Sequence, residues 1–176
     1  MITGKLLGDG SLENRGTAHS RLQIRHSIKQ RKYVDWSYEQ LKDFTASKPK
    51  QHKRSYYFRT RSLPVFTKLR KKWYQNGKKI LPDDLTISPF TLAVWYMDDG
   101  YLDRYHRTIW LCVHCFSNKE ISYLKKQLSY FDIQSGKVKD RNNYKLRVLS
   151  RDTDRFINLV KPYIFTSLLY KIGIAP

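Results

Sequence analysis

The sequence predicts an α+β fold made of two similar halves, and three observations carry this prediction. A short apolar segment ending in Asp-Gly occurs twice, at residues 2–10 and 92–100. Each copy is followed by segments that alternate apolar and basic residues, as strands with one buried face do. Other segments have the helical spacing of apolar residues that is typical of amphipathic helices. We expect residues 1–82 and 83–176 to form the two halves.

The composition favours a polyanionic partner. The chain has 176 residues, with 34 Lys and Arg against 15 Asp and Glu, which gives a net charge of +19. Hydrophobic residues make up 40% of the chain, enough to build a core. Nothing resembles a signal peptide or a membrane segment, so we expect a soluble, intracellular protein. A charge of this size also fits simple solubility or association with ribosomal-type RNA, so other features must decide.

The second apolar segment is predicted to be a helix that ends at a charged site. Ser88 and Pro89 give it an N-cap and a first-turn proline, and Gly100 gives it a stop. Nearly everything between is apolar, so both sides of the helix should be covered by protein. Asp98 and Asp99 lie at the C-terminal end, where the helix dipole disfavours a carboxylate by a few tenths to ~1 kcal/mol. A divalent cation is the candidate that would compensate for this unfavourable placement of negative charge.

The other elements are predicted in a similar order in both halves. In the first half, strands are expected at 11–15, 21–26 and 55–61, helices at 30–44 and 63–74, and a basic loop at 46–54. In the second half, strands are expected at 107–114, 136–140 and 144–149, and helices from 118 and over 152–163. A linker over 81–87 joins the halves.

The predicted strands share a polar, mostly basic face. In any single strand this pattern is more often an ordinary solvated face. Several such strands in two matched halves instead indicate a surface that binds a nucleic-acid duplex. A two-stranded ribbon fits the major groove, and Arg and Gln can hydrogen-bond to base edges there. The candidate DNA-binding residues are Arg21, Gln23, Arg25, Arg59, Arg61, Trp110, His114, Lys145 and Arg147.

The two Asp-Gly endings place Asp9 and Asp99 at matching positions. If the two helices pack together, these carboxylates approach each other, and at ~4 Å they repel by about 1–4 kcal/mol unless cations lie between them. No Ser-His-Asp, Cys-His or phosphate-loop arrangement is visible, so a shared metal site between the two carboxylates is favoured over covalent catalysis. The small residues that would permit close helix approach are Thr3, Gly4, Gly8 and Ala93.

The two segments, Ile2-Thr-Gly-Lys-Leu-Leu-Gly-Asp-Gly10 and Leu92-Ala-Val-Trp-Tyr-Met-Asp-Asp-Gly100, resemble the paired signatures of LAGLIDADG homing endonucleases in their single-chain, two-motif form. Residues 76–82, 86–100, 159–164 and 169–172 are similar to stretches of the omega-type yeast mitochondrial intron-encoded enzymes. The resemblance covers essentially the whole chain. It implies two pseudo-symmetric αββαββα halves that form a DNA-binding saddle of antiparallel strands.

The activity implied by the resemblance is that of a monomeric, site-specific endonuclease. It would use Mg²⁺ to cut both strands of a long asymmetric double-stranded DNA site across the minor groove and leave 3′ overhangs. Mn²⁺ is expected to substitute, and Ca²⁺ to support binding without efficient cleavage. No membrane partner is expected. The sequence does not indicate whether the protein works in a mitochondrion, a chloroplast or a bacterial or archaeal cytoplasm.

The resemblance also implies the site residues. Asp9 and Asp99 are the expected catalytic carboxylates. The metal site is expected to comprise Asp9, Asp99, Gly8 and Asp98. Lys79 and Lys171 match the basic residues that the family places near the scissile phosphates, where each would polarise a metal-bound water or offset charge. Their spacing agrees, since Lys79 follows Asp9 by 70 positions and Lys171 follows Asp99 by 72.

Two features depart from the family pattern, and two other functions stay open. Val94 and Asp98 replace small residues of the consensus, and Met1 directly abuts the first motif. An RNA maturase that acts on its own intron RNA, or a DNA-binding regulator that does not cleave, would use a similar basic surface. The presence of both Asp9 and Asp99 favours cleavage, because RNA binding alone does not require them.

Overall fold

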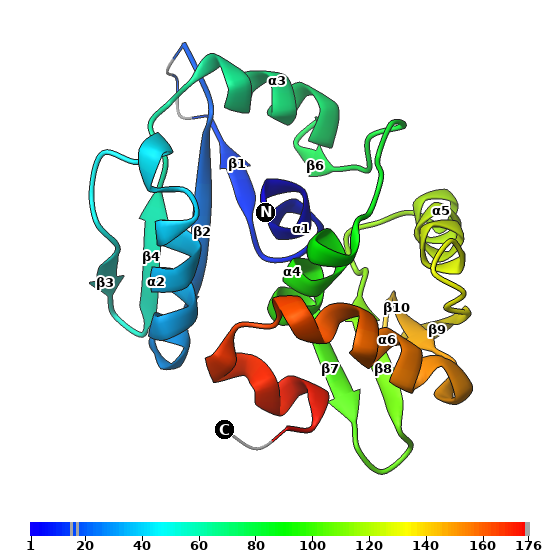
Figure 1. Cartoon of the computed structure of the whole chain (residues 1–176). Coiled ribbons are helices and arrows are strands. Elements are labelled where there is room, and N and C mark those ends of the chain that lie inside the picture. Colours follow the sequence, from blue (N-terminus) through cyan, green and yellow to red (C-terminus); the bar gives the residue numbers. More distant parts are fainter. Residues whose placement is uncertain (15, 17, 175–176) are drawn as a thin grey trace.

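The fold is α+β with the order αββαββα repeated twice (Figure 1). The structure, a computed structural model, describes residues 1–14, 16 and 18–174. The first repeat consists of α1 (Ile2–Leu7), β1 (Ser11–Glu13), β2 (Arg21–Ser27), α2 (Arg31–Glu39), β3 (Lys50–His52), β4 (Ser55–Arg59) and α3 (Pro64–Trp73). The second consists of α4 (Pro89–Asp99), β7 (Gly100–Asp103), β8 (Thr108–Cys112), α5 (Asn118–Ser129), β9 (Ser135–Asp140), β10 (Asn143–Val148) and α6 (Thr153–Val160). The predicted fold class is therefore confirmed.

Shorter elements connect and follow these repeats. A small hairpin is formed by β5 (Tyr74–Gln75) and β6 (Lys78–Lys79). Short 3-10 helices are found at Ile28–Gln30, Lys42–Phe44, Ser150–Asp152, Lys161–Tyr163 and Thr166–Ile172. Residues 81–87 contain no helix or strand, as the linker prediction requires.

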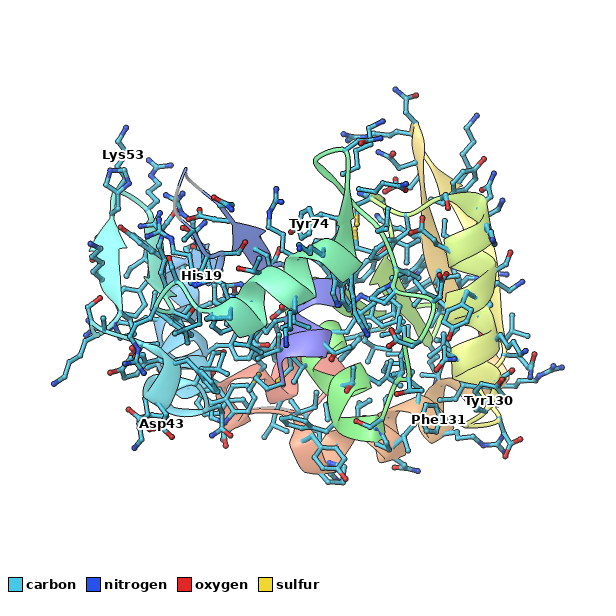
Figure 2. All side chains as sticks on the ribbon, turned by 90° about the horizontal axis from the view of Figure 1, so that it is seen from above. His19, Asp43, Lys53, Tyr74, Tyr130 and Phe131 are labelled. Atoms are coloured by element: carbon cyan, nitrogen blue, oxygen red, sulfur yellow. The ribbon has the colours of Figure 1, made fainter. Side chains whose placement is uncertain are left out.

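The two sheets have the same topology. Each has four antiparallel strands, in the orders β1-β2-β4-β3 and β7-β8-β10-β9. Helix α2 contacts β2 and β4, while α3 contacts β1 and β2; α5 contacts β9, and α6 contacts β8. Figure 2, seen from above, shows the halves on opposite sides of the centre, with Lys53 and Tyr130 at opposite edges. Each sheet therefore has one covered face and one face open to a partner.

Helices α1 and α4 lie side by side at the centre of the molecule (Figure 1). A Cβ on Gly4 would lie 2.6 Å from the Cβ of Val94, and one on Gly8 would lie 2.5 Å from the Cβ of Asp98. The larger residues of the second motif thus face glycines of the first. The predicted close approach through small residues is confirmed for Gly4 and Gly8.

One apolar core extends through both halves. Side chains of the two sheets, such as Leu22, Ile24, Leu111 and Leu146, have no exposed surface, and neither do those of residues 92–97 in α4. Helix α4 is buried on all sides because it lies between α1 and the elements of its own half, which accounts for its apolar sequence. Ser88 caps it by accepting a hydrogen bond from the Thr91 N–H, as predicted. No described helix is long and apolar enough to cross a membrane.

The structure differs from the predicted elements at several points. The helix expected at 30–44 ends at Glu39 and continues as a 3-10 turn, and β3 lies within the expected loop at 46–54. Strand β7 and the β5–β6 hairpin were not predicted. The hairpin has a sequence signal, since Asn76 and Gly77 adopt the positive φ angles, 50° and 77°, that Asn-Gly favours in a two-residue turn. The last residue of the strand expected at 11–15 lies outside the described residues.

The variant Gly4→Ala is expected to destabilise the protein by about 1–3 kcal/mol through overpacking. The added Cβ would lie 2.7 Å from the Thr91 carbonyl oxygen, and backbone cannot move aside as a flexible side chain can. A matched control is Gly136→Ala, because a Cβ there has no atom within 4 Å. Urea unfolding measures both variants. Equal unfolding free energies for Gly4→Ala and the wild type would contradict the close approach.

Candidate active site and nucleic-acid interface

The predicted carboxylates Asp9 and Asp99 are brought together at the ends of α1 and α4. Asp9 lies two residues beyond the end of α1, and Asp99 is the last residue of α4. Burial, together with the negative charges of Asp9 and Asp98, raises the pKa of Asp99 to about 7, against the opposing effects of Lys79 and Lys171. Within the described chain, the Asp99 carboxylate has no hydrogen-bond or ion-pair partner. The structure therefore leaves negative charge at this point incompletely balanced.

Asp9 has a different environment. Burial acts to raise its pKa, but the hydrogen bond and charge of His26, with Lys5 and Lys171, hold the pKa below its usual range. The Asp9 Oδ2 atom lies 3.2 Å from His26 Nδ1, and the Asp9 side chain is 42% exposed. Asp9 is therefore a carboxylate with one fixed partner and one side open to solvent.

Asp98 lies inside the protein and is neutralised there. Its Oδ1 atom accepts hydrogen bonds from Lys5 Nζ at 2.8 Å and from the Tyr33 hydroxyl at 2.7 Å. Its Oδ2 atom accepts one from the Asp9 N–H at 3.2 Å. Because the side chain has no exposed surface, the compensating cation for Asp98 is Lys5 of the other motif. The predicted role of Asp98 as a metal ligand stays a prediction, because its carboxylate is already neutralised by Lys5.

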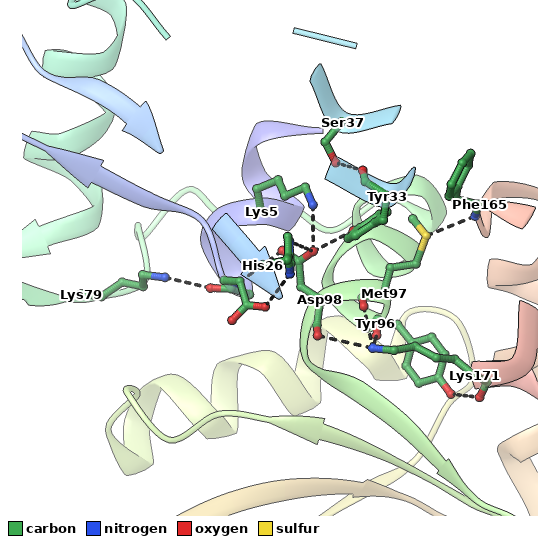
Figure 3. A network of polar contacts seen from close by, with 12 residues as sticks. Lys5, His26, Tyr33, Ser37, Lys79, Tyr96, Met97, Asp98, Phe165 and Lys171 are labelled. Atoms are coloured by element: carbon green, nitrogen blue, oxygen red, sulfur yellow. Dashed lines mark hydrogen bonds and ion pairs between the residues drawn. The ribbon is translucent and has the colours of Figure 1, made fainter. Parts of the chain in front are cut away.

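Lys5 has no exposed surface, and its ammonium lies 3.9 Å from the centre of the Tyr33 ring. Burial lowers the pKa of Lys5, and Asp98 opposes this by its charge and hydrogen bond. Burial also raises the pKa of Tyr33 well above its usual value, with Asp98 adding to the shift. We call Lys5, His26, Tyr33 and Asp98 the buried polar network (Figure 3).

Lys79 and Lys171 occupy matching places at the ends of the motif helices. Lys79 Nζ donates to the carbonyl oxygens of Gly8 and Gly10, both at 3.0 Å. Lys171 Nζ donates to the Met97 carbonyl at 2.6 Å. Burial lowers the pKa of both lysines, while charges that include the Asp99 carboxylate oppose this. The two lysines thus neutralise the negative helix ends beside the carboxylates.

The Gly8 carbonyl, part of the predicted metal site, is occupied by Lys79. Sequence reasoning did not identify Lys5, His26 or Tyr33 as site residues. The signal for Lys5 was available in the sequence, because a charged residue inside an apolar motif must have a partner. Its partner could not be read from the sequence, because Asp98 lies 93 positions away.

The open face of the first sheet carries the predicted polar residues. Strand register places Gln23 opposite Arg59 and Arg25 opposite Tyr57. Glu13 Oε2 pairs with Arg21 at 3.0 Å and with Arg59 at 3.4 Å. A hollow of 290 Å³ at this face is lined in part by Arg21, Lys48, Lys50, Arg59 and Arg61.

Tyr57 is a residue of this face that was not predicted. Its ring lies 4.8 Å from the Arg59 guanidinium, 5.6 Å from that of Arg25 and 5.8 Å from the Lys50 ammonium. The sequence could have indicated that Tyr57 lies on this face, because residues two apart in a strand point to the same side and Tyr57 precedes Arg59 by two positions. Arg61 is also exposed, and its guanidinium donates to the Asp43 carbonyl at 2.7 Å.

The open face of the second sheet is less basic. Trp110 lies opposite Arg147 on β10 and opposite Tyr101 on β7, on whose ring it stacks with 6.2 Å between centroids. Asp140 pairs with Lys145 at 2.9 Å and with His114 at 3.0 Å. All four predicted residues of the second half therefore lie on or beside one sheet face.

This sheet face also lies within electrostatic reach of the carboxylates. Burial raises the pKa of Cys112, which is opposite Lys145 in the register, and the charges of Asp99 and Asp9 add to the increase. The Cys112 position on this face therefore lies near the two carboxylates.

Lys5→Met is expected to cost about 3–5 kcal/mol of stability, because it leaves the buried Asp98 carboxylate without its cation. The double variant Lys5→Met/Asp98→Ala should regain much of that loss, since an apolar replacement of both partners is often neutral. Chemical denaturation of the wild type, both single variants and the double variant gives the coupling energy. Additive effects would contradict a direct buried pair.

The model of the LAGLIDADG DNA endonuclease family matches residues 1–156. The chain is 30% identical, over 98% of its length, to cytochrome b mRNA maturase bI2 of Debaryomyces hansenii, of which it covers 72%. It is 25% identical, over 97% of its length, to probable intron-encoded endonuclease 1 of Wickerhamomyces canadensis, of which it covers 81%. It spans only 45% to 48% of several other curated relatives.

Solved structures share the fold. The homing endonuclease I-WcaI bound to its DNA recognition sequence superposes with a TM-score of 0.90 at 24% identity, over 99% of this chain and 85% of that one. I-DmoI in complex with DNA and Mn gives a TM-score of 0.59 at 13% identity, over 90% and 95% of the two chains. The family match over most of the sequence, with two motif helices packed together, establishes that this chain belongs to the LAGLIDADG DNA endonuclease family in its single-chain form.

Proposed function

We propose that this protein is a site-specific DNA endonuclease that cuts both strands of a long, asymmetric double-stranded site and leaves 3′ overhangs. The observation that carries the proposal is the meeting of Asp9 and Asp99 at the junction of α1 and α4, next to open sheet faces rich in cations. It acts as a monomer, with residues 1–82 and 83–176 as the halves that serve the two strands. The family membership supports the nuclease reaction.

Asp9 and Asp99 are the residues that would hold Mg²⁺. The donor set fits this ion, which prefers one or two carboxylates and completes its shell with water and phosphate oxygens. The unpartnered Asp99 carboxylate, with its raised pKa, is a site where a cation would relieve repulsion. When bound, the metal would supply an activated water and neutralise charge on the phosphate. Mn²⁺ should substitute and Ca²⁺ should support binding alone; solved I-DmoI complexes contain Mn, Mg or Ca.

Lys79 and Lys171 would hold positive charge beside the two scissile phosphates. Each is fixed by backbone carbonyls at the end of a motif helix, so its ammonium is held in place before DNA arrives. A fixed cation stabilises the charge that develops on the phosphate in the transition state. This is the role we assign to both lysines.

DNA would lie across the two open sheet faces. Arg21, Arg25, Arg59 and Arg61 are candidates for base edges or phosphates, and Gln23 for adenine. Trp110, His114, Lys145 and Arg147 would contact the other half-site. Glu13 and Asp140 hold Arg21, Arg59, His114 and Lys145 in fixed positions, which favours defined contacts over general attraction to phosphate.

A second candidate function is that of an RNA maturase. The observation that favours it is the 30% identity to a protein named as a maturase. Its partner would be intron RNA. A maturase would bind and help to splice that RNA with Asp9→Asn in place, whereas the endonuclease reaction requires this carboxylate.

Asp9→Asn and Asp99→Asn should each abolish double-strand cleavage and leave DNA binding within about twofold, because Asn cannot balance a divalent cation as a carboxylate does. The substrate is DNA selected from a randomised library by binding in Ca²⁺. Gel assays in Mg²⁺ report cleavage, and Ca²⁺ binding assays report affinity. Full cleavage by either variant would contradict the mechanism, because it would show that the replaced carboxylate is not required.

Divalent-ion affinity should increase as pH rises through about 7, because a protonated Asp99 must lose its proton to bind the ion. Without metal, the folded protein keeps the Asp99 carboxyl protonated at pH values above its ordinary pKa of 3.8. Asp99 therefore stabilises the fold at low pH, and this contribution is lost as the pH rises from 3.8 to about 7. The Ca²⁺-induced increase in Tm should therefore be larger at about pH 8 than at about pH 6. Asp99→Asn is the control and should lose this pH dependence. An equal Tm increase at both pH values would contradict the assignment.

A further inference from the structure

The two carboxylates at the centre of the molecule have unequal neighbours. Asp9 Oδ2 lies 3.2 Å from His26 Nδ1, and the Asp9 N–H donates to Asp98. The Asp99 carboxylate lacks any hydrogen-bond or ion-pair partner among residues 1–14, 16 and 18–174. One carboxylate is thus held by a side chain, and the other is not.

Strand register identifies the residue that takes the place of His26 in the second half. Ser11, two residues after Asp9, pairs with Gln23, and Tyr101, two residues after Asp99, pairs with Trp110. His26 is three residues beyond Gln23, and three residues beyond Trp110 is Val113. Val113, the residue after the end of β8, is buried, with 1% of its surface exposed, and its side chain cannot donate a hydrogen bond. The difference between the halves is therefore built into equivalent positions.

The His26 ring is held in its position by groups from both halves. Its side chain is 2% exposed, and Nε2 lies 3.6 Å from Asp98 Oδ1. The ring packs at 5.2 Å against Tyr33, which is itself hydrogen-bonded to Asp98. Held in this way, the ring presents Nδ1 to Asp9. A donor fixed on both sides restricts the rotamer of the carboxylate that accepts from it.

We propose that His26 is a positioning residue that sets the orientation of Asp9, and that the two DNA strands are consequently cut at unequal rates. This inference rests on the proposed endonuclease function. The halves are related by pseudo-twofold symmetry, as the two strands of a duplex are, so each carboxylate serves mainly one strand. The Asp9 carboxylate is oriented before DNA binds, whereas the Asp99 carboxylate would be oriented by metal and substrate.

His26→Phe tests the proposal, because it keeps a ring against Tyr33 and removes the donor to Asp9. His26→Asn is the rescue variant, since its amide nitrogen can take the place of Nδ1. Each strand of the selected DNA carries its own end label, and single-turnover cleavage in Mg²⁺ gives two rate constants. His26→Phe should slow one strand by about 10- to 100-fold more than the other, as misplacement of a catalytic group does. His26→Asn should restore much of the original ratio.

The matched control is Ile24→Val, on the same strand and the same covered face. It removes one methylene from the core and touches neither carboxylate, so the strand ratio should stay at its wild-type value. Thermal unfolding and DNA binding in Ca²⁺ establish that each variant is folded. Equal slowing of both strands by His26→Phe, or no slowing, would overturn the role of His26.

Failure of the endonuclease function itself gives a different result. In that case the wild type would cut neither strand of the DNA that it binds. Wild-type cleavage combined with an unchanged strand ratio in His26→Phe would instead overturn only the positioning role.

Discussion

The contact between α1 and α4 determines where every element of the proposed site lies. Gly4 and Gly8 allow the helices to approach, and Lys5 of one motif neutralises Asp98 of the other without any exposed surface. A buried lysine without a carboxylate would be strongly unfavourable. Each motif therefore depends on the other for its own charge balance. The consequence is that Asp9 and Asp99, at the ends of these helices, are held at one point.

The same contact makes the two halves complementary rather than identical. Where the second motif carries Val94 and Asp98, the first carries glycines that leave room for them. His26 accompanies Asp9, whereas the equivalent register position in the second half is Val113. A pseudo-symmetric protein that recognises an asymmetric site is free to let its halves diverge in this way. If the sheet faces bind DNA as proposed, specificity would be divided between a strongly basic face and a less basic one that presents Trp110.

Much of the fold could be predicted from the sequence, because the repeated motif and the alternating strands are local patterns. The Ser88 cap, the apolar α4 and the open-face arginines all follow from spacing alone. The partners of Lys5 and the place of His26 could not be predicted, since these contacts join segments far apart in the chain. Asp98 shows this most clearly. Its position next to Asp99 in the sequence suggests a second metal ligand, but in the structure its carboxylate accepts a hydrogen bond from the buried Lys5. Strand β3 was missed because its exposed, polar residues resemble a loop.

The central claim is that the carboxylate pair at the α1–α4 junction supports metal-dependent cleavage of both DNA strands. The most direct test binds the wild-type protein to a randomised DNA library in Ca²⁺, replaces Ca²⁺ with Mg²⁺ and sequences the ends of both strands. We expect paired breaks at one recovered sequence, with 3′ overhangs. Stable, sequence-selective binding without breaks in Mg²⁺ or Mn²⁺ would contradict the claim and favour the maturase function.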